Sequence, residues 1–134
     1  MRVGTLEITA ALAAVALVAS RPRRRVTAEL GRLAPVHVTL EYAERGERRR
    51  YEGLAPFDIG REANAAVPLA DPEVSRRHAR LELRDGIVFL RDLESRNGTF
   101  LNGYRVTTPV EIRVGDEIDV GTTRMRVEDV RLWT

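Results

Sequence analysis

Residues 79–92 read ARLELRDGIVFLRD and consist of two short runs, 79–84 and 87–92, on either side of Asp85-Gly86. Both runs alternate apolar and polar residues or are rich in β-branched residues, which is typical of strands, and Asp-Gly is a strong turn signal. Runs of the same kind recur at residues 36–42, 48–54, 57–59, 110–114, 117–120 and 124–130. Further glycine-containing turn signals lie among them, and no amphipathic pattern of helical length appears there. The sequence therefore predicts an all-β fold, an antiparallel β-sandwich.

The composition indicates an aliphatic core and no metal or disulfide chemistry. Hydrophobic residues make up 43% of the 134 residues but aromatic residues only 5%, so aliphatic side chains must fill most of the core. Cysteine is absent, which excludes a disulfide framework and a zinc-finger pattern. With only two histidines to add to the acidic residues, the sequence predicts neither a metal site nor a cofactor.

Basic charge is concentrated near the N-terminus. Residues 1–33 contain six arginines and two acidic residues, whereas residues 34–134 contain sixteen arginines and eighteen acidic residues. A nucleic-acid-binding domain should carry its basic excess on a folded face. Because the excess lies outside the predicted sandwich, the sequence does not favour nucleic-acid binding.

Residues 3–20 form an apolar run in which Glu7, near one end, is the only charged residue. As a helix this run would be roughly 27 Å long, close to the thickness of the hydrocarbon core of a bilayer. Four arginines follow within residues 21–25, and the positive-inside rule then places the C-terminal side in the cytoplasm. We expect a transmembrane helix within residues 1–20, a basic juxtamembrane linker at 21–35 and the folded domain at 36–134. A cleavable signal peptide and a soluble or interfacial helix are the alternatives.

Three polar segments lie at the ends of predicted strands and are not needed to build them: Gly60-Arg61, Ser75-Arg76-Arg77-His78 and Ser95-Arg96-Asn97-Gly98-Thr99. With the later Asn102-Gly103, Gly115-Asp116 and Gly121, they resemble the signature of the forkhead-associated (FHA) domain family in order, spacing and residue type. The chain as a whole resembles small bacterial membrane-anchored FHA proteins. The resemblance implies an FHA-type antiparallel sandwich of about eleven strands, whose loops at one edge hold a phosphothreonine peptide.

The resemblance also implies a role for each polar residue at that edge. Arg61 and the Ser75 hydroxyl would contact the phosphate, and Arg76 could add a charge-assisted hydrogen bond. The side-chain amide of Asn97 would bond the peptide backbone beside the phosphothreonine, and Arg96 would contact the ligand from the same loop. These residue types suit the ligand, because a phosphothreonine brings about −1.5 to −2 charges and strong acceptor oxygens. Arg61 could instead be a solvated turn arginine, Arg76 a surface arginine that points away, and Asn97 only the support of a left-handed turn.

Gly60, His78 and Gly98 are predicted to support the binding loops. In the family that this chain resembles, the histidine braces the loops through hydrogen bonds and does not touch the phosphate. A hydrolase that pairs Ser75 with His78 as nucleophile and base is the enzyme alternative. The sequence has no Gly-x-Ser-x-Gly elbow, however, and His37 is its only other histidine. It therefore favours a binding module that is not an enzyme.

The predicted function is a phosphothreonine-peptide-binding adaptor at the cell membrane, with its FHA domain in the cytoplasm. It would recruit a threonine-phosphorylated partner, such as a bacterial Ser/Thr kinase or its substrate. The alternative is a structural FHA subunit of a secretion or cell-division assembly in which phosphate binding is secondary or lost, although intact Arg61, Ser75 and Asn97 argue against loss. Two subsidiary hypotheses concern Thr27, which could be phosphorylated and fold back onto the site, and Glu94, whose charge could disfavour acidic residues near the phosphosite.

Overall fold

The computed structural model describes residues 34–133, and these residues form eleven strands in two sheets, with no helix among them. In chain order the strands are β1 (Val36–Glu44), β2 (Glu47–Leu54), β3 (Phe57–Gly60), β4 (Val67–Pro68), β5 (Ala79–Arg84), β6 (Ile87–Asp92), β7 (Thr99–Leu101), β8 (Tyr104–Arg105), β9 (Val110–Glu111), β10 (Glu117–Val120) and β11 (Thr123–Leu132). The predicted all-β fold of about eleven strands is confirmed.

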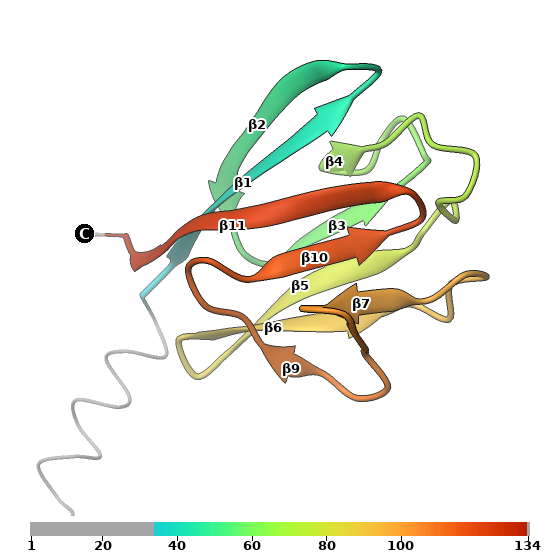
Figure 1. Cartoon of the computed structure of the whole chain (residues 1–134). Coiled ribbons are helices and arrows are strands. Elements are labelled where there is room, and N and C mark those ends of the chain that lie inside the picture. The colour runs from blue at the N-terminus through green and yellow to red at the C-terminus, as the bar shows by residue number, and fades with distance from the viewer. Residues whose placement is uncertain (1–33, 134) are drawn as a thin grey trace, which may run out of the picture.

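The two sheets pack face to face as a sandwich (Figure 1). One sheet has the strand order β2-β1-β11-β10-β7-β8, and the other has the order β4-β3-β5-β6-β9. The first and last strands pair along most of their length, from Val36 opposite Leu132 to Tyr42 opposite Met125. This long antiparallel pairing joins the two ends of the described chain in the middle of one sheet.

One pairing corrects the prediction of a purely antiparallel sandwich. β3 and β4 are parallel, with Ile59 opposite Val67 and Gly60 opposite Pro68. The chain leaves β3 through residues 61–66 and returns to lie beside it in the same direction. This connection is shorter than the usual crossover between parallel strands, and it begins with Arg61 of the first polar segment.

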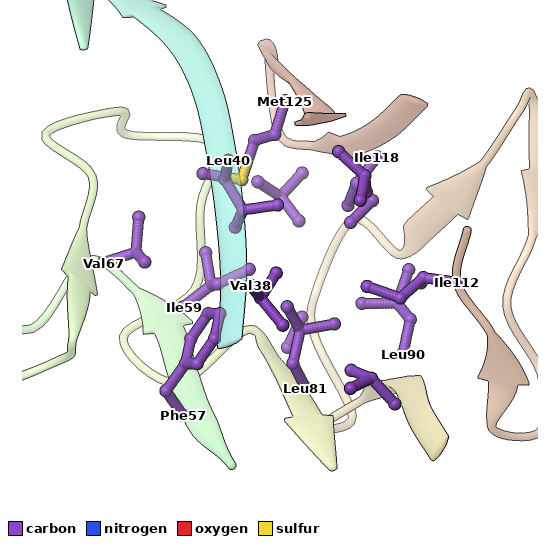
Figure 2. Packing of buried hydrophobic residues seen from close by; sticks show 14 of the residues in the cluster. Val38, Leu40, Phe57, Ile59, Val67, Leu81, Leu90, Ile112, Ile118 and Met125 are labelled. Carbon is purple, nitrogen blue, oxygen red and sulfur yellow. The ribbon is translucent and has the colours of Figure 1, made fainter. Parts of the chain in front are cut away.

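Aliphatic side chains fill the space between the sheets. Because successive side chains of a strand point to opposite faces, the alternation seen in the sequence becomes an inward and an outward face; in β5, Ala79 and Leu81 are fully buried. Phe57 and Met125 are the non-aliphatic members of the buried hydrophobic cluster formed by residues 34–133. Figure 2 shows side chains from both sheets meeting there, among them Leu40, Ile118 and Met125 from one sheet and Ile59, Leu81 and Leu90 from the other.

Three strands of the structure have no counterpart among the predicted runs. β4, β7 and β8 contain only two or three residues each, which is too short to show an alternation in the sequence. Their pairing partners define them, and β10, one of the two partners of β7, lies well separated from it along the chain. The run predicted at residues 110–114 is a strand only over Val110–Glu111, and Val114 is exposed.

The two ends of the sandwich carry different parts of the chain (Figure 1). At one end the backbone N–H of Trp133 donates to the carbonyl oxygen of Pro35 over 2.7 Å. The loops that follow β3, precede β5 and join β6 to β7 gather at the other end. The three polar segments therefore lie remote from the point at which residues 34 and 35 enter the fold.

The predicted transmembrane helix at residues 1–20, Thr27 and all but the last two residues of the predicted linker at 21–35 lie outside the described residues. For residues 34–133, the structure contains no helix with the length and hydropathy needed to span a membrane.

Candidate functional site

A cleft of about 210 Å³ lies among the loops at the end of the sandwich remote from Pro35 and Trp133. It brings together all five predicted contact residues, which come from three separate segments of the chain. The residues that line it are Arg61, Pro72, Glu73, Val74, Ser75, Arg76, Arg96 and Asn97. The three predicted support residues, Gly60, His78 and Gly98, are buried and take no part in the lining.

Close approach of two segments fixes Arg61 at the cleft. Its backbone N–H donates to the carbonyl oxygen of Ser75 over 3.0 Å, and its side-chain Nε donates to the carbonyl oxygen of Val74 over 3.1 Å. This leaves the two terminal nitrogens of the guanidinium for a ligand. Gly60 permits the approach, because a Cβ at this position would lie 2.1 Å from the carbonyl oxygen of Arg76.

The ring of His78 connects two of the loops from below the cleft. His78 is completely buried; its Nδ1 accepts a hydrogen bond from the backbone N–H of Ser75 over 3.0 Å, and its Nε2 lies 2.8 Å from the carbonyl oxygen of Gly98. Because Nδ1 accepts a hydrogen bond, the proton of the neutral ring is on Nε2, which donates to the carbonyl oxygen of Gly98. Gly98 has a φ of +86°, a conformation that favours glycine and that turns its carbonyl oxygen toward the ring.

The bonds of the His78 ring bear on the hydrolase alternative. Both ring nitrogens of His78 are bonded to backbone atoms of residues 75 and 98, so the ring does not activate the Ser75 hydroxyl as the hydrolase alternative requires. Over the part of the chain that the structure describes, no group of three or more histidine, aspartate or glutamate side chains could hold a metal ion.

The Ser75 hydroxyl is held at the cleft as a hydrogen-bond acceptor. Its Oγ accepts from the backbone N–H of Arg96 over 3.0 Å, which ties the loop before β5 to the loop between β6 and β7. Among the hydrogen bonds within residues 34–133, the hydroxyl proton goes to no acceptor. Ser75 can therefore donate this proton to an oxygen of a bound phosphate.

Asn97 is held against Glu73. Its Nδ2 donates to both the carbonyl oxygen and the carboxylate Oε2 of Glu73, each over 2.9 Å. The side-chain oxygen of Asn97 accepts no hydrogen bond from the described residues. It can therefore accept from the N–H of a peptide that crosses the cleft.

The three arginines of the cleft form no ion pair within residues 34–133. Elsewhere in the domain arginines generally have a carboxylate neighbour, as in the pair of Arg80 and Asp58 at 2.7 Å. Arg61, Arg76 and Arg96 belong to none of these pairs. Unpaired cations gathered in one cleft produce a positive field that suits a dianionic ligand.

Asp92 supports the loop between β6 and β7, a role that the sequence did not reveal. Its carboxylate accepts hydrogen bonds from the backbone N–H and hydroxyl of Ser95 and from the hydroxyl of Thr99, at 3.2, 2.5 and 2.6 Å. The Ser95 hydroxyl in turn accepts from the backbone N–H of Gly98 over 3.0 Å. Ser95 and Thr99 thus brace the loop that presents Asn97.

Asp71 ties the cleft to the turn between β10 and β11. One of its carboxylate oxygens accepts from the backbone N–H of Glu73 over 2.9 Å. The other accepts from the backbone N–H and hydroxyl of Thr122 and from the hydroxyl of Thr123, at 2.8, 2.7 and 3.0 Å. Burial acts to raise the pKa of Asp71, but the hydrogen bonds together outweigh it and hold the pKa below its ordinary value.

Two of the remaining motifs of the signature, Asn102-Gly103 and Gly115-Asp116, support the fold away from the cleft. The Nδ2 of Asn102 donates to Oδ1 of Asp116 over 3.0 Å, and the backbone N–H of Glu117 donates to the Asn102 side-chain oxygen over 2.9 Å. These bonds join the turn between β7 and β8 to the start of β10. The bonds lie where β7 ends and β10 begins. The opposite ends of these two strands, at Thr99 and Val120, lie beside the binding loops.

Comparison with known proteins assigns the family. The FHA domain model matches residues 57–121. A structure from a study of phosphothreonine-dependent FHA domain interactions aligns with a TM-score of 0.63 and 33% identity, covering 69% of this chain and 96% of that one. This chain belongs to the FHA domain family. The confirmed sandwich is therefore of the FHA type. FHA domains are phosphopeptide-binding modules rather than enzymes.

Two other FHA proteins are similar to this one. The FHA domain of FhaA, solved in complex with the intracellular domain of Rv3910, aligns with a TM-score of 0.61 and 34% identity over 68% of this chain and 99% of that chain. FhaB of Mycolicibacterium smegmatis is 35% identical over 111 residues, which are 80% of this chain and 64% of FhaB. The chain thus spans less than two thirds of the length of this curated relative.

Replacing Asp71 by asparagine should destabilise the FHA domain. The asparagine amide would place an N–H donor where an oxygen of the carboxylate accepts hydrogen bonds. The loss of these charge-assisted bonds should lower the free energy of unfolding by about 1–3 kcal/mol at neutral pH. Urea denaturation of the full chain, followed by circular dichroism, measures this difference. Asp119→Asn is the control, because Asp119 forms a surface ion pair with Arg124 that should contribute less than about 1 kcal/mol.

The effect of Asp71 should depend on pH with a defined sign. Because the pKa of Asp71 is lower in the folded chain than in the unfolded chain, its carboxylate stabilises the fold at pH values above the unfolded pKa of about 3.9. That stabilisation is lost as the pH falls through the folded pKa. The difference between native chain and Asp71→Asn should therefore shrink below about pH 4, and a difference that stayed constant there would contradict the assignment to charge.

Proposed function

We propose that this chain is a phosphothreonine-peptide-binding adaptor that recruits a threonine-phosphorylated protein, a Ser/Thr kinase or its substrate, to the cytoplasmic face of the cell membrane. One observation carries the binding part of the proposal. Arg61, Arg76 and Arg96 line one cleft without any carboxylate partner among the described residues, together with the free hydroxyl proton of Ser75. A phosphate group supplies the charge and the acceptor oxygens that this set of donors lacks.

The relatives support a peptide as the carrier of that phosphate. One of the similar structures comes from a study of phosphothreonine-dependent interactions, and another holds an FHA domain on the intracellular domain of a second protein. In this chain the open oxygen of Asn97 offers a peptide N–H an acceptor beside the three arginines. A free phosphate ion would leave that acceptor unused, which favours a phosphorylated peptide as the ligand.

The membrane part of the proposal rests on the apolar run at residues 3–20 and on the orientation of the domain. Residues 34 and 35 enter the sandwich at the end opposite the cleft (Figure 1). In a domain tethered through residues 21–35 to a helix in the bilayer, the cleft would lie at the end remote from the tether. This orientation leaves the cleft accessible to a soluble or membrane-bound partner.

Arg61→Ala should weaken binding of phosphothreonine peptides by roughly tenfold to a hundredfold, because it removes a charge-assisted contact to the phosphate. Titration of a phosphothreonine peptide library against the full chain, by fluorescence anisotropy, identifies a ligand and gives its dissociation constant. The matched control is Arg48→Ala, which removes the same charge from an 89% exposed side chain on β2. Failure of every phosphothreonine peptide to bind the native chain would refute the proposed function, and equal affinity in Arg61→Ala would refute the site.

The chain should also require residues 1–33 for membrane association. In cells that express the full chain, we expect it in the membrane pellet after a carbonate wash, because a spanning helix resists extraction. A version containing only residues 34–134 should remain in the supernatant. Equal partitioning of the two versions would argue against an anchor in residues 1–33.

A further inference from the structure

Glu73 is the only acidic residue among those that line the cleft. Hydrogen bonds on both sides of its Cα fix its backbone. Its backbone N–H donates to Asp71 over 2.9 Å, and its carbonyl oxygen accepts from Asn97 over 2.9 Å. Glu73 is exposed, and its carboxylate Oε2 accepts the second hydrogen bond from the Asn97 amide.

The Glu73 carboxylate sets a negative charge beside Asn97 in a cleft that otherwise carries only positive charge. Glu73 forms no ion pair among the described residues, although three unpaired arginines share the cleft with it. A phosphate held by Arg61 and Ser75 occupies the cationic part. The peptide residues that flank the phosphothreonine and pass over Asn97 then meet a carboxylate that forms no ion pair with the described residues.

We propose that Glu73 determines specificity by selecting phosphothreonine peptides that carry an arginine or lysine beside the phosphothreonine. The basic residue would lie in the part of the peptide that passes over Asn97. The inference rests on the proposed function and adds the class of ligand sequence. A basic side chain at that position would pair with the Glu73 carboxylate. An acidic side chain would be repelled by it, so that one residue supplies both an attractive and a repulsive element of selection.

Glu94 is the competing source of such a preference and provides a matched control. It is exposed on the neighbouring loop, with a φ of +54°, a conformation that favours glycine. It lines a separate hollow with Arg77, Arg91, Asp92 and Leu93 rather than the cleft. A charge there lies beside a different surface, so the structure favours Glu73 over Glu94 as the residue that a flanking side chain meets.

The test compares phosphothreonine peptides that differ only by arginine or aspartate at each position from three residues before to three residues after the phosphothreonine. Dissociation constants are measured by fluorescence anisotropy with the full chain in detergent, at low ionic strength. At one or more positions beside the phosphothreonine, the native chain should bind the arginine peptide roughly fivefold to twentyfold more tightly than the aspartate peptide. The attraction of arginine to Glu73 and the repulsion of aspartate from it each change the binding free energy only modestly, because Glu73 is exposed. The preference should diminish at high salt.

Glu73→Gln retains an acceptor for Asn97 but removes the charge, and it should reduce the preference to less than about twofold. Glu94→Gln should leave the preference unchanged. The inference is overturned if peptides bind without any preference for arginine, if Glu73→Gln leaves the preference intact, or if Glu94→Gln alone abolishes it. If no phosphothreonine peptide binds the native chain, the proposed function fails and the inference fails with it, so the two failures are distinguishable.

Discussion

The geometry of the cleft depends on the buried ring of His78, whose two nitrogens are both bonded to the backbone of the binding loops. A buried imidazole needs a partner for each nitrogen, and Ser75 and Gly98 satisfy this need only when their loops lie in the observed arrangement. The hydrogen bond from Arg96 to the Ser75 hydroxyl follows from that arrangement. These hydrogen bonds hold the loops in one arrangement, and internal bonds that fix binding loops lower the entropic cost of binding.

Charge is distributed to match this geometry. Outside the cleft, most arginines of the described residues pair with a carboxylate, as Arg84 and Arg91 do with Glu82. Within the cleft, cations remain unpaired in a domain in which acidic residues slightly outnumber arginines. The positive field is thus local, and a β-sandwich, which by itself implies no activity, becomes a scaffold for recognising an anion at one end. Basic pI alone would have suggested a broader and less specific interaction.

Much of the fold could be predicted from the sequence, because strands such as β5 and β6 alternate clearly and flank an Asp-Gly turn. The parallel pairing of β3 with β4 could not, since a two-residue strand shows no pattern and its partner is chosen in space. The positions of the site residues followed from a resemblance to a family, and the structure brings them into one cleft. The contacts of Asp71 with Thr122 and of Asn97 with Glu73 could not be predicted, because they join residues distant along the chain whose types carry no signal of the pairing.

The central claim is that the loops bound to His78 form a phosphothreonine site. The most direct measurement is an NMR titration of residues 34–134 with a phosphothreonine peptide and its unphosphorylated form. The account predicts that the phosphorylated peptide alone shifts backbone amide resonances, with the largest changes at residues 61, 75, 96 and 97 around the cleft. Shifts concentrated elsewhere on the sandwich, or equal shifts with the unphosphorylated peptide, would contradict it.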